Sequence, residues 1–156
     1  MKLRIIAVGH KMPAWIEAGF QEYAKRMTSD ATLELVEIKP EKRAAGASTE
    51  RIQKIEAERI LAALPAQAKL IALDERGKQL STAELSDLLA RWKQEGSTPC
   101  FVIGGADGLD NTVKTRADLL LGLSRLTLPH GLARVMLAEQ LYRADSLLKG
   151  HPYHRE

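Results

Sequence analysis

Apolar positions follow two different spacings along the chain, and the two spacings alternate. Short, nearly continuous apolar runs are typical of buried strands, and such runs occupy 4–8, 33–38, 70–74, 101–103 and 123–128. Elsewhere apolar residues recur every three or four positions, which predicts helices over 13–27, about 50–64, 82–95, 112–121 and 132–148. The polar segment 28–30 is expected to end the first helix. Alternating strands and helices favour an α/β fold, with a parallel sheet and helices on both faces.

The clearest helix signal lies between Ser81 and Gly96. Ser81 is followed three residues later by Glu84, a capping box in which each side chain accepts a hydrogen bond from the other residue's backbone N–H. The apolar residues behind it stand at i, i+3, i+4 and i+7: Leu85, Leu88, Leu89 and Trp92. Gly96 is expected to end this helix.

The composition is that of an ordinary globular chain. Its 156 residues, 45% apolar and 28% charged, fit one domain over 1–156. No apolar run is long enough to span a membrane, and the apolar part of the N-terminus is too short for a signal peptide, so a cytoplasmic protein without membrane contact is expected. Cys100 is the only cysteine. It excludes an intrachain disulfide and is interpreted as a small buried residue in a strand.

The charge balance permits an anionic partner without demanding one. The formal net charge is +3 and the pI is about 9.1, which falls short of a protein that binds nucleic acid by charge alone. Aromatic residues make up 4% of the chain, so few side chains are available to stack on unpaired bases. One cysteine and four scattered histidines give no metal-ligand spacing, and no metal is expected.

A glycine loop directly follows the predicted strand at 101–103. Gly104, Gly105 and Gly108 stand where ligands bind in open α/β sheets, and glycine lets the backbone approach a ligand closely. The residues alone leave a ligand cradle and a tight connection without a ligand equally open. The loop matches neither G-x-G-x-x-G nor G-x-x-x-x-G-K-[ST], which disfavours a dinucleotide or triphosphate ligand.

The end of the chain carries groups that are typical of binding sites. Tyr153, His154 and Arg155 supply an aromatic ring, an imidazole and a guanidinium where most chains carry little chemistry. By themselves these residues favour a solvated end. His130, after Pro129, fits a hydrogen-bonded loop residue as well as a direct role, and His10 is expected at the surface.

Four segments together resemble one family of enzymes. They are Val8-Gly9-His10-Lys11-Met12-Pro13, Ile103-Gly104-Gly105-Ala106-Asp107-Gly108, Leu126-Thr127-Leu128-Pro129-His130-Gly131 and Tyr153-His154-Arg155-Glu156. The chain resembles the small SPOUT-class RNA methyltransferases over its whole length. It is most similar to the bacterial family that methylates N3 of a pseudouridine in 23S rRNA.

The resemblance implies a fold and a cofactor that the residue pattern alone does not propose. It implies a C-terminal trefoil knot, although knots are nearly absent from folds, and S-adenosylmethionine as the methyl donor. It places the cofactor contacts at Leu73, Gly104, Leu123, Ser124, Arg125, Leu126, Thr127 and Leu128. Backbone groups and apolar walls suffice to hold an adenine, so these residue types suit the role.

The resemblance also implies that the tail forms the catalytic site. N3 of pseudouridine carries an imide proton, and the anion that develops as this proton leaves needs a nearby positive charge or donor. Arg155 is permanently charged and would supply it, His154 would accept the proton, and Tyr153 would stack on or bond to the base. The substrate implied is 23S rRNA in the assembled ribosome.

Two further expectations concern partners. The resemblance implies a homodimer through part of the last helix, where Asp145 stands in place of the bulky aromatic that the family often has. Basic residues in two predicted loops are either solvated or contact rRNA phosphates: Lys11, Lys39, Lys42 and Arg43. The rival interpretation is a non-catalytic nucleotide- or RNA-binding α/β module, which would keep the glycine loop but need no ordered tail.

Overall fold

The computed structural model describes residues 1–27 and 30–155, and the side chain of His154 lies outside this description, as does most of the expected break at 28–30. Strands and helices alternate along the described chain. The strands are β1 (Lys2–Val8), β2 (Thr32–Ile38), β3 (Ala68–Gln79), β4 (Thr98–Ile103) and β5 (Leu119–Gly122). The helices are α1 (Ala14–Ala24), α2 (Thr49–Ala62), α3 (Thr82–Glu95), α4 (Asn111–Arg116) and α5 (His130–Leu148), followed by a 3-10 turn, η1 (Pro152–Arg155).

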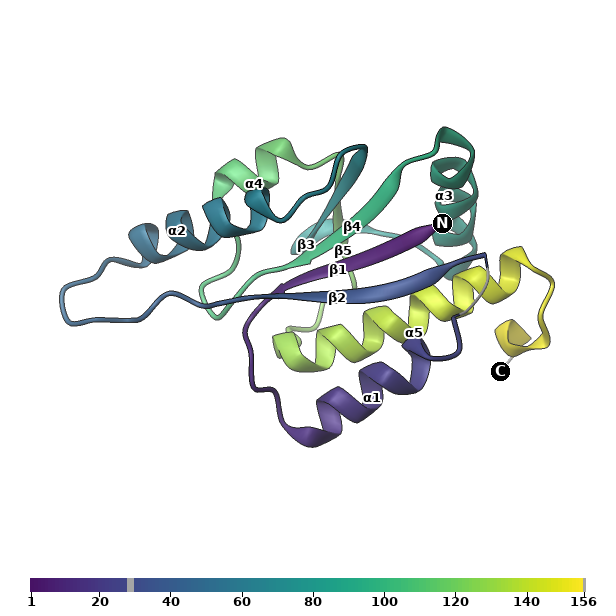
Figure 1. The fold of residues 1–156 in the computed structure, drawn as a ribbon, viewed down its shortest axis with the longest axis horizontal. Helices are drawn as coiled ribbons and strands as arrows, with labels where there is room; N and C mark the ends of the chain where they lie inside the picture. Colours follow the sequence, from purple (N-terminus) through teal and green to yellow (C-terminus); the bar gives the residue numbers. More distant parts are fainter. Residues whose placement is uncertain (28–29, 156) are drawn as a thin grey trace.

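The strands of the described chain form one sheet in the order β2-β1-β4-β3-β5 (Figure 1). Each pair of neighbouring strands is parallel. A parallel neighbour requires a crossover connection, and the helices provide these connections. The predicted α/β fold with a parallel sheet is confirmed.

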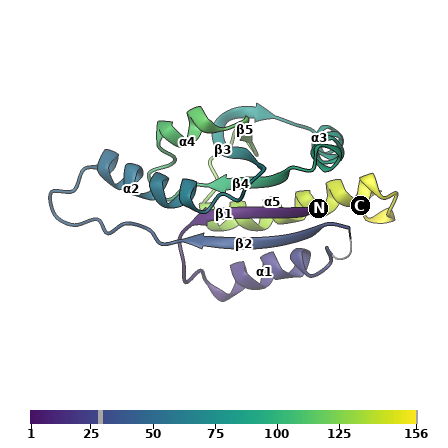
Figure 2. The same cartoon turned by 45° about the horizontal axis from the view of Figure 1, so that its top comes forward.

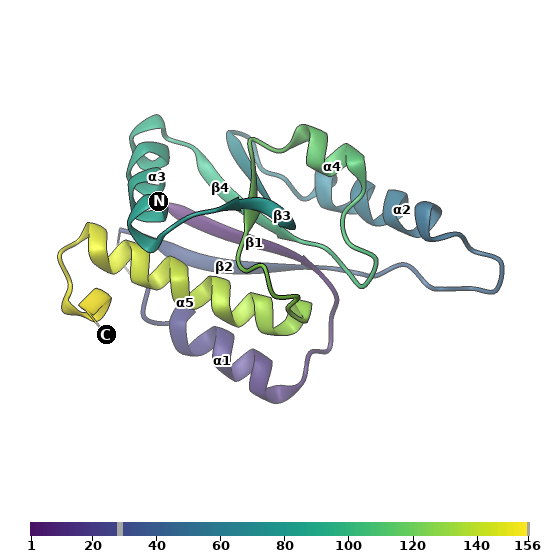
Figure 3. The same ribbon diagram turned by 180° about the vertical axis from the view of Figure 1, so that it is seen from behind.

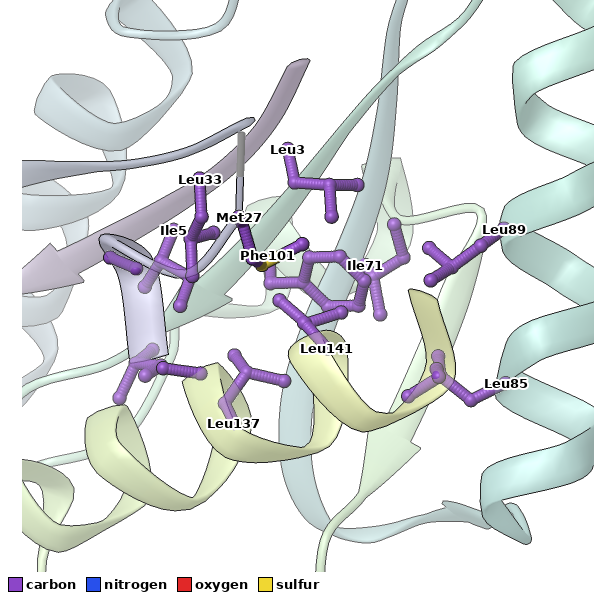
Figure 4. Packing of buried hydrophobic residues seen from close by; sticks show 14 of the residues in the cluster. Leu3, Ile5, Met27, Leu33, Ile71, Leu85, Leu89, Phe101, Leu137 and Leu141 are labelled. Atoms are coloured by element: carbon purple, nitrogen blue, oxygen red, sulfur yellow. The ribbon is translucent and has the colours of Figure 1, made fainter. Parts of the chain in front are cut away.

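Helices cover both faces of the sheet, and alternate residues of each strand supply the two faces. Leu3, Ile5 and Ala7 of β1 belong to a buried cluster with α1, α3 and α5. Ile6 and Val8 belong to a second cluster with α2 and α4 on the opposite face. Figures 2 and 3 show the two layers of helices, and Figure 4 shows how Leu137 and Leu141 of α5 pack toward Phe101 and Ile71 of the sheet.

Local sequence signals fix the ends of α3. Ser81 Oγ accepts a hydrogen bond from the backbone N–H of Glu84 at 3.0 Å, and a carboxylate oxygen of Glu84 accepts one from the backbone N–H of Ser81 at 2.8 Å. Gly96 follows the helix with φ 69°, a left-handed conformation that glycine adopts without strain. The capping box predicted from the sequence is confirmed, and so is the position of the helix end.

Two predicted elements between 112 and 128 are wrong. The helix expected over 112–121 ends at Arg116, and the leucines that follow it form β5. Residues 123–128, expected as a strand, instead connect β5 to α5. Asp118 decides the pairing, because its carboxylate accepts a hydrogen bond from the backbone N–H of Leu70 and its own N–H donates to the carbonyl of Leu70, each at 2.8 Å.

Strand β3 also runs past its predicted end at Asp74. Its pairing with β5 shifts between Leu73 and Lys78, so that both residues lie opposite Leu121 and the intervening segment bulges out of the ladder. A Cβ on Gly77 would lie only 2.6 Å from the carbonyl carbon of Leu121, so the bulge requires glycine there. The bulge lies beside the cavity described below.

Two smaller expectations, on Cys100 and His10, can be compared with the fold. Cys100 is fully buried in β4, as expected, and His10 is exposed, as expected. In the described part of the chain no helix combines the length and the apolar character needed to cross a membrane. The described residues also hold no cluster of three or more histidine, cysteine or acidic side chains suited to a metal ion.

Candidate active site

A cavity of about 560 Å³, called the main cavity below, opens among the described residues at the carboxyl ends of β3, β4 and β5. In parallel sheets this is the edge where ligands bind. Three segments form the walls: the end of β3 with its bulge, the glycine loop after β4, and the connection between β5 and α5. The predicted cofactor residues that line it are Leu73, Gly104, Leu123, Ser124, Leu126, Thr127 and Leu128. Arg125 is exposed and does not line the cavity.

The glycine loop is a tight turn closed on itself. The backbone N–H of Gly108 donates to the carbonyl of Gly105 at 3.0 Å, and Gly108 has φ 78°. A Cβ on Gly104 would lie 2.8 Å from the carbonyl carbon of Gly108. Gly104 is therefore required by the packing of the loop itself, whether or not a ligand also approaches it.

The connection over 123–128 forms an exposed rim of the cavity. Ser124 Oγ accepts a hydrogen bond from the backbone N–H of Leu126 at 2.9 Å, which bends the chain there. The side chain of Leu126 remains 76% exposed although it is large and apolar. An exposed leucine on the wall of a cavity offers a contact surface to whatever fills that cavity.

The bulge of β3 supplies charged groups that the sequence analysis did not select. Asp74, Glu75 and Arg76 all line the cavity. The backbone N–H of Arg76, 2.9 Å from Asp74 Oδ1, and the Lys114 ammonium, 2.9 Å from Oδ2, hold the pKa of Asp74 below its ordinary value. Asp74 is thus an anion at neutral pH. Its position directly after the apolar run 70–73, at the strand end expected from the sequence, is the signal that would have found it.

A smaller second cavity, about 260 Å³ in volume, lies on the other side of the glycine loop. Gly105, Ala106, Asp107 and His130 line both cavities. The remaining walls come from the segment after β1, which includes His10, from the loop after β2 and from α2. His130 is the first residue of α5 rather than a loop residue, so the helix begins two residues before its expected start at Leu132.

The predicted catalytic tail lies far from both cavities within the chain. His130 begins α5 beside the cavities, and the tail follows the other end of this helix of 19 residues (Figures 1 and 3). At about 1.5 Å per residue the two ends of α5 are about 28 Å apart. One chain therefore does not bring Tyr153 or Arg155 to its own main cavity.

The tail instead folds against its own helix. The Tyr153 hydroxyl donates to a carboxylate oxygen of Glu139 at 2.9 Å, and its ring centroid is 4.5 Å from that of Tyr142. The Arg143 guanidinium lies 4.8 Å from the Tyr153 ring centroid, within cation–π range. Burial and the hydrogen bond to Glu139 raise the pKa of the Tyr153 phenol. Arg155 is exposed.

The chain that carries this cavity is similar to known methyltransferases. The family described as "Predicted SPOUT methyltransferase" matches residues 1–154. The chain belongs to the SPOUT methyltransferase family. The chain is thus a methyltransferase, as the resemblance implied, and the rival non-catalytic module is set aside.

Similar proteins match this SPOUT methyltransferase from end to end. A protein of Thiobacillus denitrificans named "Ribosomal RNA large subunit methyltransferase H" is 61% identical over 156 residues, covering 100% of both chains. Proteins of the same name from Nitrosospira multiformis and Burkholderia multivorans are 57% and 58% identical, covering 99% of each chain. A solved structure of a probable methylase family protein from Haemophilus influenzae has a TM-score of 0.53 at 15% identity, covering 97% of this chain and 69% of its own, which supports the fold alone.

The basic residues of the predicted loops gather near the second cavity of this SPOUT methyltransferase. Lys11, Lys39 and Lys42 are exposed. Arg43 lines the second cavity and forms an ion pair of 2.6 Å with Asp107 of the glycine loop. All four cations are thus exposed to a partner, and Arg43 is in addition engaged with the glycine loop.

Asp145 of the last helix is buried, with an ion pair of 2.8 Å to Lys149. Asp145, which replaces the aromatic that the family often has, is therefore buried within this chain. Its carboxylate is neutralised by Lys149, four residues later at the end of α5.

Proposed function

We propose that this chain transfers a methyl group from S-adenosylmethionine to N3 of a pseudouridine in 23S rRNA, acting on assembled ribosomes in the cytoplasm. The observation that carries the proposal is a cavity at the carboxyl ends of three parallel strands, in a chain of the SPOUT methyltransferase family. Full-length relatives named for methylation of ribosomal RNA of the large subunit support the substrate class. The whole chain, 1–156, acts as one domain.

The residues of the main cavity fit the proposed cofactor. Its volume of about 560 Å³ lies in the range of small-ligand sites. Leu73, Leu123, Leu126 and Leu128 provide apolar walls for an adenine, and the backbone at Gly104 provides hydrogen-bonding groups. The carboxylate of Glu75, exposed on the β3 bulge, can accept hydrogen bonds from hydroxyl or amino groups. When bound, S-adenosylmethionine supplies an electrophilic methyl group on a sulfonium.

In the proposed reaction the bond between N3 and the methyl carbon forms, the bond between sulfur and that carbon breaks, and the proton leaves N3. Arg155 would stabilise the negative charge that develops on the imide oxygens. His154 would take the proton, since an imidazole titrates near neutral pH. Tyr153 would stack on the base. For this the hydrogen bond between its hydroxyl and Glu139 must break.

These roles require two subunits. The tail of one chain is about 28 Å along α5 from its own cavity, so we propose a homodimer in which the tail of each subunit reaches the cavity of the other. The chain beyond β5 would also be threaded as the trefoil knot of the family. The strand order, with β5 at the edge beside β3, and the family membership support this threading.

The decisive experiment is methyl transfer from labelled cofactor to ribosomes that lack the modification. We expect label in 23S rRNA, and mass spectrometry of the digested rRNA should identify N3-methylpseudouridine. Ribosomes that already carry the methyl group are the matched control and should take up none. Label at another position, or on another atom of the base, would overturn the assignment.

Calorimetry tests the cofactor placement separately. Gly104→Val should bind S-adenosylmethionine at least tenfold more weakly than the native chain, because its Cβ collides with the backbone of Gly108 and distorts the wall of the cavity. Gly46 lies in the loop after β2, where a Cβ meets nothing within 4 Å, so Gly46→Ala adds only the backbone strain of its φ of 84° and should bind normally. Unchanged affinity in a folded Gly104→Val chain would exclude this placement.

A further inference from the structure

The second cavity is placed where a methyl acceptor would have to lie. The glycine loop separates it from the main cavity, and Gly105, Ala106, Asp107 and His130 line both. Group transfer requires the two reacting atoms to approach within about 3–3.5 Å. Two ligands, one in each cavity, can approach to this distance where the two cavities meet at the glycine loop.

Hydrogen bonds from charged and polar side chains hold the walls of this cavity in place. Arg43 pairs with Asp107 at 2.6 Å, which fastens the loop after β2 to the glycine loop. Gln53 of α2 donates a hydrogen bond to the carbonyl of Asp107. Gly9 in another part of the wall accepts a hydrogen bond of 3.2 Å at its carbonyl from Arg134, which is only 2% exposed. A cavity whose walls are tied together in this way is preorganised.

Glu56 has an exposed fraction of 6%. Among the described residues that line this cavity, it is the one acidic residue that is almost completely buried. Its Oε2 accepts a hydrogen bond from the backbone N–H of Glu41 at 3.0 Å. Its Oε1 lies on the side of the glycine loop, 3.4 Å from where a Cβ of Gly105 would be. A carboxylate offers about four lone-pair sites, so Glu56 keeps acceptor capacity for a ligand.

The size and the lining of the cavity suit a single pyrimidine ring. Its volume of about 260 Å³ is below the range of cofactor-sized sites. Val8, Met12 and Ile52 provide apolar surface for the faces of a ring, and Glu56 provides an acceptor for its edge. A base that fills the cavity displaces water from this acceptor, so a base without a donor at that place would leave the oxygen unpaired at a cost in free energy.

We propose that the second cavity binds the target base and that Glu56 accepts a hydrogen bond from its N1–H, which selects pseudouridine over uridine. The proposal rests on the proposed function. In pseudouridine the ribose is attached at C5, so N1 carries a hydrogen. When uridine takes the same orientation, C5–H occupies that place and offers no hydrogen bond. A site built around such a bond discriminates strongly against an analogue that lacks it.

The substitution Glu56→Gln tests the selectivity. A glutamine has one oxygen acceptor, and the backbone N–H of Glu41 already requires it. The side-chain NH₂ would then meet N1–H, donor against donor. Methyl transfer to ribosomes with pseudouridine at the target position should fall about ten- to a hundredfold, the loss expected for a hydrogen bond to a charged group. The lower rate on ribosomes with uridine there should stay unchanged.

Glu58→Gln is the matched control, since Glu58 lies on the same helix and is exposed. It should leave both rates unaltered. Two further measurements separate binding from catalysis. Calorimetry should give the native affinity of Glu56→Gln for S-adenosylmethionine. Sedimentation with ribosomes in the absence of cofactor should show that the preference for pseudouridine-containing ribosomes is lost.

The outcomes distinguish this proposal from the proposed function. If the native chain methylates pseudouridine and Glu56→Gln keeps the native ratio of pseudouridine to uridine rates, the base-binding role is wrong and the function stands. If Glu56→Gln instead weakens the cofactor, the second cavity belongs to the cofactor and the proposal is overturned. If the native chain methylates neither kind of ribosome, the proposed function itself fails.

Discussion

Mixing two inactive variants of this chain should restore methyl transfer, because the tail and the main cavity lie at opposite ends of α5. The helix has 19 residues, so its ends are about 28 Å apart. Tyr153 stands five residues beyond Leu148 and reaches at most about 18 Å from it, even in a fully extended chain. A tail that acts in catalysis must therefore enter the cavity of a partner subunit.

The first variant lacks 153–156 and keeps its cavity. The second is Ala106→Trp, which places an indole on an exposed position that lines both cavities and leaves the tail intact. Each should be inactive alone, and calorimetry should show cofactor binding for the first and not for the second. The truncation removes the hydrogen bond to Glu139 and the ring contact with Tyr142, so its melting temperature should fall by only a few degrees.

The assay is methyl transfer to ribosomes after the two variants have been mixed in equal amounts and allowed to exchange subunits. Random exchange makes about half of the dimers mixed, and each mixed dimer has one complete site of two, so about a quarter of the native specific activity should return. A mixture no more active than its components would refute the idea that two subunits build each site. A truncated chain with the native rate would refute the catalytic role of the tail.

The remaining predictions concern charge and packing. The backbone N–H of Arg76 and the Lys114 ammonium lower the pKa of Asp74 below 3.8, so its contribution to stability is present above that pH and is lost as the pH falls through the folded-state pKa. Lys114→Ala should thus lower the free energy of unfolding at pH 7 by up to about 1 kcal/mol. In denaturant titrations the difference should shrink as the pH falls below 3.8 and Asp74 is protonated; a constant difference would contradict it. Lys42→Ala should reduce the log–log salt slope of ribosome binding by about 0.9, whereas an unchanged slope would make the loop a solvated connection. Leu137→Ala, at a fully buried position, should cost about 2–5 kcal/mol in urea unfolding, and a loss below about 1 kcal/mol would mean that α5 does not hold the core.

Local chemistry made much of the fold predictable. Ser81, Glu84 and Gly96 act through contacts with their own neighbours, so the ends of α3 could be derived without the rest of the chain. The glycine loop was also placed correctly, because it follows a clear apolar strand. The segment from 119 to 128 failed for the opposite reason. Three consecutive leucines satisfy a helix and a strand equally, and the pairing of Asp118 with Leu70, 48 residues away, makes the choice.

The candidate site also contains residues that the sequence predicted and residues that it did not. Leu73, Gly104 and most of 123–128 came from the family resemblance, and the fold brings them to one cavity without Arg125. Asp74 carried no periodic signal, and its charged role depends on Lys114, which approaches from α4. The burial of Glu56 could not be predicted from the sequence either, because α2 carries several charged residues and nothing in the pattern distinguishes this one.

The sequence by itself determined the alternation of strands and helices, the capped helix and the chemical types gathered in the glycine loop and the tail. These depend on spacing and on neighbours within one turn of chain. Only the tertiary structure decided which segments meet: the sheet order puts the ends of β3, β4 and β5 around one cavity, and α5 carries the tail about 28 Å away from it. Contacts between distant residues depend on how whole elements pack, and no local pattern encodes that packing.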